Sequence, residues 1–162
     1  MHPRAAELIA ALDLRPHPEG GYYREIYRSD LQVIPPDGRG PRAALTTIYF
    51  LLPNGMHSRW HQVRSDEVWH LYDGGPLELL ELRPDGSDLT RHWLTVPSAP
   101  GGGPVHTVRA NDWQAAQVTN GYALVGCTVA PGFEFADFRL LADDTEMSAR
   151  IRARWPEAAA LI

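Results

Sequence analysis

Residues 58–75 read SRWHQVRSDEVWHLYDGG, and this stretch predicts a β-hairpin. Two segments rich in β-branched and aromatic residues, Ser58–Val63 and Glu67–Tyr72, flank the polar turn at residues 64–66. A second turn follows at residues 73–76, where DGGP supplies the glycine and proline that tight turns favour. The pattern therefore predicts two paired strands followed by a reversal of the chain.

The same hairpin gathers His61, Asp66, Glu67 and His70 within ten residues. Imidazole and carboxylate groups that lie together can bind a metal or exchange protons with a substrate. On spacing alone, a polar hairpin rim without chemistry fits equally well. Strict strand alternation places Glu67 and Trp69 on one face and His70 on the other. His70 is therefore expected to lie beside Glu67 only if a bulge intervenes, and otherwise at a sheet or subunit contact.

Further short strands are expected on both sides of the hairpin. Turn residues interrupt apolar segments at near-regular intervals, which is typical of a β-sandwich or barrel, jelly rolls included. The predicted strands are 22–28, 44–52, 58–63, 67–72, 77–82, 89–96, 105–108, 113–118, 122–129 and 133–141, with a glycine-rich loop over 98–104. The apolar spacing at residues 8, 9 and 12 predicts a short N-terminal helix, and a C-terminal helix is expected over 145–155.

Composition bounds the class of protein. The chain has 162 residues, which favours one domain over 1–162 with a β core at about 20–142. The net charge is −5, with scattered arginines and no lysine, so no nucleic-acid partner is expected. No apolar run approaches the ~20 residues of a membrane helix, and the N-terminus lacks a signal-peptide pattern. We therefore expect a soluble, cytoplasmic protein without a membrane partner, in which the lone Cys127 is a buried strand residue.

Several segments resemble the cupin superfamily. Six residues separate Glu67 from Gly74, as in the first cupin motif, and His61 stands where the first histidine of that motif belongs. Longer segments are similar to the small single-domain cupin branch labelled as a domain of unknown function: PHPEGGYYREIYRS, TTIYFLL, SDEVWHLYDGGPLELLEL, DWQAA and GYALVGCTVAPGFEFADF. The matches run from about Leu14 to Phe138. The resemblance implies an all-β double-stranded β-helix, with short helices at both ends of the chain, and a homodimer.

The chain departs from the cupin pattern at two ligand positions. Val63 replaces the second histidine of the first motif, and Gln114 replaces the histidine of the second. A typical cupin metal site uses three histidines and one glutamate, so no cofactor is expected. The alternative is a weakly held divalent metal on His61, Glu67 and Gln114.

The segment HPEGGYYREIY is similar to the N-terminal segment of dTDP-dehydrorhamnose epimerases, which are metal-free cupins. That resemblance implies a substrate contact at Glu25 and a general base at His61. Glu67, the neighbour of His61 across the predicted hairpin, is the expected catalytic partner that orients His61 or raises its basicity. An imidazole near a carboxylate can be tuned close to neutral pH. The further substrate-binding candidates are Tyr23, Trp69, His70, Trp113 and Gln114.

The leading hypothesis is an enzyme that acts on a small polar or sugar-like metabolite by metal-independent acid–base chemistry, as an epimerase or isomerase does. The alternatives are a metal-assisted cupin enzyme and a non-catalytic small-molecule-binding cupin. A homodimer is expected because a strand such as TTIYFLL, residues 46–52, is apolar on both faces. Its interface is predicted near the N-terminus or on the sheet face opposite the pocket.

Overall fold

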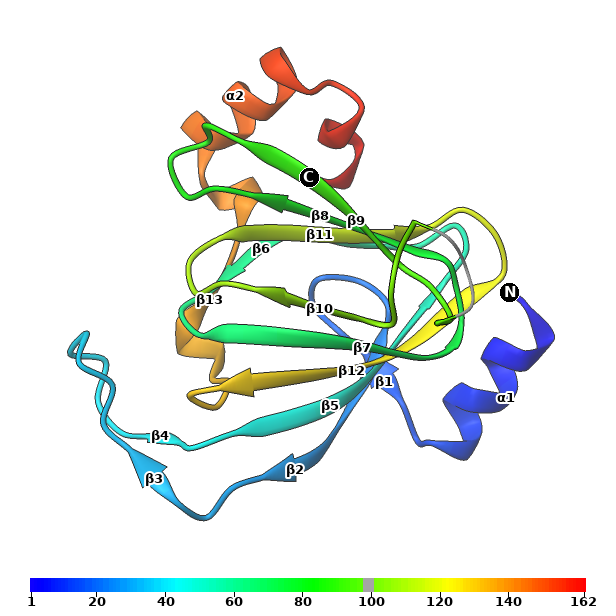
Figure 1. Ribbon diagram of the computed structural model, residues 1–162, viewed down its shortest axis with the longest axis horizontal. Coiled ribbons are helices and arrows are strands. Elements are labelled where there is room, and N and C mark those ends of the chain that lie inside the picture. The colour runs from blue at the N-terminus through cyan, green and yellow to red at the C-terminus, as the bar shows by residue number, and fades with distance from the viewer. Residues whose placement is uncertain (98–100) are drawn as a thin grey trace.

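The computed structural model describes residues 1–97 and 101–162 and consists of two antiparallel sheets that face each other (Figure 1). The first sheet has six strands, in the order β1 (Arg15–Pro16), β2 (Tyr22–Arg28), β5 (Thr46–Pro53), β12 (Tyr122–Ala130), β7 (Asp66–Gly74) and β10 (Val105–Val108). The second has five, in the order β13 (Phe138–Leu140), β6 (His57–Val63), β11 (Trp113–Val118), β8 (Leu77–Leu82) and β9 (Leu89–Leu94). A separate two-stranded ribbon joins β3 (Gln32–Val33) to β4 (Arg42–Ala43).

Most of the predicted strands are confirmed, and four of them, β2, β8, β10 and β11, have the predicted bounds. The segment predicted as one strand over 133–141 is different: residues 135–137 form a 3-10 turn, and only β13 pairs, with β6. The Asp137 amide donates to the Glu134 carbonyl at 2.9 Å and closes this turn, and Phe135 packs edge-on against Phe133 and Phe138. Within the loop predicted over 98–104, residues 98–100 lie outside the described residues.

The central core fills the space between the two sheets. Phe50, Trp69 and Leu79 belong to it, and each is almost completely buried. Alternation along each strand sends every second side chain into this space. The prediction that β6 and β7 pair as a hairpin is wrong, because the two strands belong to different sheets and each pairs with other strands. The turn at residues 64–66 crosses from one sheet to the other, so the polar residues at 61–67 lie where the sheets face each other.

Each sheet carries one helix on its outer face (Figure 1). Helix α1 (Pro3–Ala11) packs Ala5 and Leu8 against Leu51 of β5. Helix α2 (Thr145–Arg154) begins at Asp144, whose carboxylate caps the Met147 amide, and it covers the outer face of the second sheet. Both predicted helices are therefore present, and part of the apolar outer face of β5 is covered within the chain.

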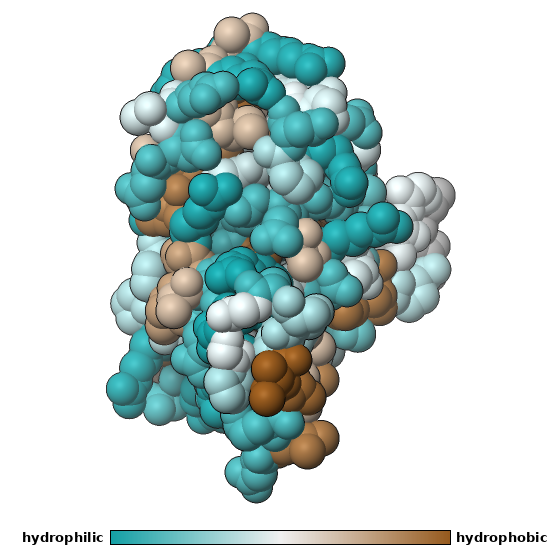
Figure 2. All heavy atoms as spheres, turned by 90° about the vertical axis from the view of Figure 1, so that its left-hand side faces the viewer, coloured by the Kyte–Doolittle hydropathy of each residue, from teal (hydrophilic) through white to brown (hydrophobic). Residues whose placement is uncertain are grey.

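The face of the molecule seen in Figure 2 is mainly hydrophilic, with hydrophobic side chains gathered in a few small patches. Among the described residues, no helix is long and apolar enough to cross a membrane.

Candidate active site between the sheets

A cavity of about 320 Å³ lies between the two sheets, beside β2, β5 and β13. Its walls combine aromatic and aliphatic side chains with polar groups that are buried at the base and exposed at the rim. The aromatic side chains of the wall are Tyr23, Phe50, Phe133, Phe135 and Phe138. Cavities of this size that combine apolar walls with a few convergent polar groups are typical of small-molecule sites.

The polar base of the cavity centres on Glu19, which lies in the loop between β1 and β2. The loop is fixed to β6 by the Arg59 amide, which donates to the Glu19 carbonyl at 2.8 Å. Ser58 Oγ donates to Glu19 Oε1 at 2.7 Å. The Glu19 side chain is only 9% exposed, and this burial raises the pKa of its carboxyl to about 8. Glu19 therefore carries a proton at neutral pH and can donate a hydrogen bond.

Gly20 explains why this loop can approach β6 so closely. Its φ is +115°, and a Cβ at this position would lie 2.1 Å from the His57 carbonyl oxygen. The preceding His17 holds the same turn, because its carbonyl accepts from the Gly20 amide and its Nδ1 accepts from the Glu19 amide. Burial lowers the pKa of His17 to about 4, so its imidazole is neutral.

His61 of β6 presents a free lone pair to the cavity. Its Nδ1 lies 2.7 Å from the Arg59 carbonyl oxygen, which can only accept, so Nδ1 carries the proton. Its Nε2 is therefore the acceptor, and it lies 3.3 Å from Glu19 Oε2. Burial lowers the pKa of His61, although the nearby Glu67 carboxylate acts in the opposite direction. The result is a neutral imidazole that faces a protonated carboxyl.

Glu67 of β7 lies on the same cavity wall, and burial raises the pKa of its carboxyl. Its Oε2 accepts from Gln114 Nε2 at 2.6 Å, and Gln114 Oε1 in turn accepts from Trp69 Nε1 at 3.0 Å. Both ends of the Gln114 amide are thus engaged. Cys127 lines the cavity beside Glu67 and stays a thiol, because burial raises its pKa.

Charged side chains stand where the cavity meets solvent. Arg28 forms a two-bond contact with Glu25, at 3.0 and 2.8 Å, and a third bond to Glu134 at 2.7 Å. All three side chains are more than a third exposed. The only arginine that lines the cavity in the described residues is therefore neutralised by two carboxylates.

The structure brings together four of the residues that the sequence proposes. His61, Glu67, Tyr23 and Glu25 all line the cavity. Gln114 and Trp69 do not line it, and they lie behind Glu67 as a hydrogen-bonded pair.

Trp113 and His70, like Trp69 and Gln114, do not line the cavity, and the positions of Trp113 and His70 follow from strand alternation. Trp113 precedes Gln114 on β11, so it faces the other way and packs into the cluster under α2. His70 follows Trp69 on β7 and faces the outer side of the first sheet. The expectation that Trp69, His70, Trp113 and Gln114 contact a ligand in this cavity is therefore corrected.

Sequence reasoning missed Glu19 and did not include His17 among the site candidates. Glu19 belongs to no catalytic motif, and the glycine pair after it was the one available signal that the chain comes close to another strand there.

The two facing antiparallel sheets, with an imidazole and carboxyls buried between them, define a double-stranded β-helix protein of the cupin class. A family model described as Cupin superfamily (DUF985) matches residues 6–141. The chain therefore belongs to this family.

Solved structures agree with this assignment. A hypothetical protein from Leishmania major is 32% identical with a TM-score of 0.84, over 98% of this chain and 96% of that chain. A protein from Shewanella oneidensis is 32% identical with a TM-score of 0.80, over 99% and 94%. Oxalate decarboxylase from Bacillus subtilis shares the fold alone, at 14% identity and a TM-score of 0.59, over 93% of this chain and 37% of that chain. A comparison with curated proteins finds no match.

The residues at the cupin metal position do not fit a resident metal ion. Val63 offers no ligand, and the Gln114 oxygen is already the acceptor for Trp69. Within residues 1–97 and 101–162, no group of three imidazole, thiol or carboxylate ligand atoms close enough to share an ion includes His61 or Glu67.

Proposed function

We propose that this cupin is an enzyme that binds a small, uncharged polar or sugar-like metabolite in the cavity and moves a proton on it. The observation that carries the proposal is the pairing of His61 Nε2 with Glu19 Oε2 at 3.3 Å, at the base of an aromatic cavity. An imidazole with a free lone pair accepts protons, and a protonated carboxyl donates them. The reaction class that uses both is isomerisation or epimerisation beside a carbonyl group.

In this scheme His61 Nε2 takes a proton from a carbon next to the substrate carbonyl, while Glu19 donates its proton to the carbonyl oxygen. An enol results, and returning the two protons at new positions gives the isomer. Glu67 supports the step because a carboxylate beside His61 stabilises the imidazolium that forms. The Nδ1 proton on the Arg59 carbonyl keeps the ring in the tautomer that this role requires.

The cavity wall favours an uncharged substrate. His17 and Glu19 at its base are neutral at pH 7, and Arg28 at the rim is already paired with Glu25 and Glu134. A phosphate or carboxylate in the base would have no cation to compensate the loss of its hydration. The apolar faces of a sugar or a related ring can pack on Tyr23 and Phe138.

A metabolite-retention experiment tests this proposal. The purified protein is mixed with a cell metabolite extract, unbound compounds are removed, and retained compounds are identified by mass spectrometry and offered again as substrates. We expect a retained carbonyl compound that the wild type converts and that His61→Asn and Glu19→Gln bind without converting. His70→Ala, on the outer face of the first sheet, is the matched control and should convert it normally.

Two other outcomes would overturn the proposal in different directions. A compound that the wild type retains but never alters would make this a binding cupin. Conversion that stops with a chelator and returns with a divalent metal would support the metal-assisted alternative.

We also propose that the protein is a homodimer that associates through the outer face of the first sheet. Tyr27 lies opposite Thr47, next to Tyr49 on β5, and Tyr49 packs edge-on against Tyr72 at 6.1 Å. Tyr27 and Tyr72 are each more than half exposed. Aromatic side chains gathered on one exposed face are the type that protein interfaces favour.

A further inference from the structure

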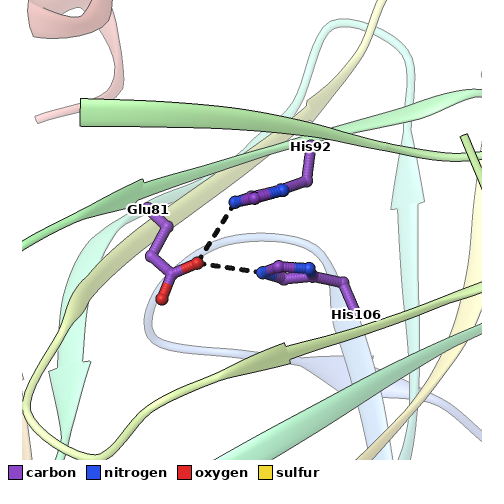
Figure 3. Close-up of side chains that lie close together, drawn as sticks. All are labelled: Glu81, His92 and His106. Carbon is purple, nitrogen blue, oxygen red and sulfur yellow. Dashed lines mark hydrogen bonds and ion pairs between the residues drawn. The ribbon is translucent and has the colours of Figure 1, made fainter. Parts of the chain in front are cut away.

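A second cluster of titratable side chains lies away from the cavity, and the proposed reaction does not use it (Figure 3). Glu81 of β8, His92 of β9 and His106 of β10 point toward one another. Glu81 Oε2 lies 3.2 Å from His92 Nε2 and 2.9 Å from His106 Nε2. The two imidazole rings are stacked, with centroids 3.6 Å apart.

The sheet register explains why three strands converge here. His92 lies opposite Leu79, and His106 lies opposite Trp69. Because Leu79 and Trp69 point into the central core, the two histidines also face the space between the sheets. Strands β9 and β10 are the edges of their respective sheets, so the cluster lies where these two edges meet.

The hydrogen-bonded pair of Trp69 and Gln114 separates this cluster from the cavity. Gln114 of β11 lies opposite Glu81 of β8, and Trp69 of β7 lies opposite His106 of β10. Their side chains bond to each other at 3.0 Å and, beyond that, to Glu67. The cluster is therefore distinct from the proposed active site.

The geometry of the three ligand atoms suits a single metal ion. Metal bonds of about 2.0–2.1 Å at tetrahedral angles place ligand atoms roughly 3.3 Å apart. The two oxygen-to-nitrogen distances, 3.2 and 2.9 Å, are close to this value, and all three atoms lie within 4.8 Å of one another. The side chains are 13–31% exposed, so an ion and its water ligands can reach them.

The charge around the cluster also favours a cation. The Asp112 side chain forms a hydrogen bond with Glu81, so a second acidic side chain lies directly beside the three ligand atoms. Among the described residues, the one guanidinium that contacts either acidic side chain is Arg83, which lies 2.9 Å from Asp112. Two acidic side chains beside a single guanidinium leave room for a divalent ion to balance their charge.

We propose that Glu81, His92 and His106 bind one divalent transition-metal ion such as zinc, with water completing its coordination. The ion replaces the imidazole protons that otherwise point at Glu81, and Asp112 acts as the hydrogen-bond partner that orients the Glu81 carboxylate. Two imidazoles and one carboxylate are ligands that zinc accepts. Bound there, the ion would link β8, β9 and β10 and so join the open edges of the two sheets.

Zinc binding to the tag-free protein tests this proposal. Titration calorimetry with zinc, supported by metal analysis after dialysis, should give one ion per chain, and zinc should raise the melting temperature. His92→Ala and His106→Ala should each abolish the stoichiometric binding and the thermal shift. Asp112→Asn should weaken binding by roughly 10–100-fold, as loss of an outer partner does. Cobalt added in place of zinc should give visible absorption bands that the histidine variants lack.

The controls separate this site from the cavity and from loss of the fold. His61→Asn and His70→Ala should bind zinc as the wild type does. Glu81→Gln keeps the size and hydrogen bonding of the side chain, so it should stay folded and still lose the ion. The proposal is overturned if the wild type binds no stoichiometric zinc, if His92→Ala and His106→Ala bind it unchanged, or if His61→Asn abolishes it. None of these results depends on whether the cavity is catalytic.

Discussion

Burial without a cationic partner gives Glu19 its chemical character. The nearest cation that acts on its carboxyl is Arg59, but the Arg59 guanidinium bonds to the Pro18 carbonyl and forms no ion pair with Glu19. The Glu19 carboxyl instead contacts the side chains of Ser58, His17 and His61. The hydrogen bond from Ser58 favours the ionised form, but burial outweighs it, so the pKa rises to about 8. The carboxyl is therefore an acid at the pH where His61 is a base.

The raised pKa of Glu19 predicts a specific dependence of stability on pH. Between its unfolded pKa, near 4.5, and its folded pKa, about 8, the folded chain keeps a proton that the unfolded chain releases. The Glu19 contribution to the free energy of unfolding is therefore full below pH 4.5 and is lost as the pH rises to 8. Because each unit corresponds to about 1.4 kcal/mol, Glu19→Gln should gain a few kcal/mol relative to the wild type between pH 5 and pH 8.

Urea denaturation of both proteins at several pH values measures this difference. Glu25→Gln, at the solvent-exposed rim, is the control and should show no comparable gain. A stability difference between Glu19→Gln and the wild type that stays constant from pH 5 to pH 8 would mean that Glu19 is ionised in the folded protein.

Some of the residues of the site could be predicted from the sequence alone. His61 and Glu67 could be proposed because their positions match the first cupin motif, and both line the cavity. Glu19 could not, because its protonation depends on burial between β6 and the loop before β2, which no local pattern encodes. Glu25 was proposed from the same segment, and it lies at the rim in contact with Arg28.

At the scale of the elements, the close approach of the 17–21 turn to β6 holds Glu19 over His61. Gly20 is the point of contact, since a Cβ there would meet the His57 carbonyl oxygen at 2.1 Å. The atoms that this Cβ would meet belong to the backbone of β6, so no flexible side chain could move away to make room for it.

Gly20→Ala should therefore lower the free energy of unfolding by clearly more than the backbone strain of an alanine at positive φ would do alone. Gly55→Ala is the matched control: Gly55 has φ +86°, and nothing lies within 4 Å of its added Cβ. We expect Gly55→Ala to cost about 1–2 kcal/mol from backbone strain alone, and Gly20→Ala to cost several kcal/mol and to lose ligand retention. Equal unfolding free energies for the two variants would show that the turn does not need this approach.

Strand alternation also explains which element-level expectations were right. Glu67 and Trp69 share the inner face of β7 as expected, with Trp69 in the core and Glu67 at the cavity. The joint assignment of Trp113 and Gln114 to the pocket was wrong, because Gln114 lies behind Glu67 and not in the cavity wall. Adjacent residues on β11 cannot share a face, so Trp113 packs on the outer side of its sheet. Applying to β11 the argument already used for His70 would have predicted this.

For the whole molecule, the strand positions could be predicted from turn residues, while the pairing of strands could not. Strand β5 pairs with β2 and β12, and β6 pairs with β11 and β13. These partners are far apart in the sequence, and only the resemblance to cupins indicated that they meet. The cluster of Glu81, His92 and His106 escaped prediction for the same reason, since its three strands belong to two sheets.

Self-association is the prediction that belongs to this scale. Light scattering at micromolar protein should give twice the chain mass of 18.0 kDa. Tyr72→Arg, on the exposed outer face of the first sheet, should shift the protein to monomer because it places a charge in an apolar contact. Trp93→Arg on β9 is the control and should leave the dimer intact. A monomer mass for the wild type would refute the dimer.

The central claim is that His61 transfers a proton to and from a compound held in the cavity, and solvent exchange measures this step directly. The retained compound is incubated with the protein in deuterated water and analysed by mass spectrometry and NMR. Wild type and His70→Ala should introduce deuterium at the carbon next to the carbonyl group, and His61→Asn should slow this exchange by roughly a hundredfold or more. Exchange at the wild-type rate in His61→Asn, or a compound that never gains deuterium from the wild type, would contradict the account.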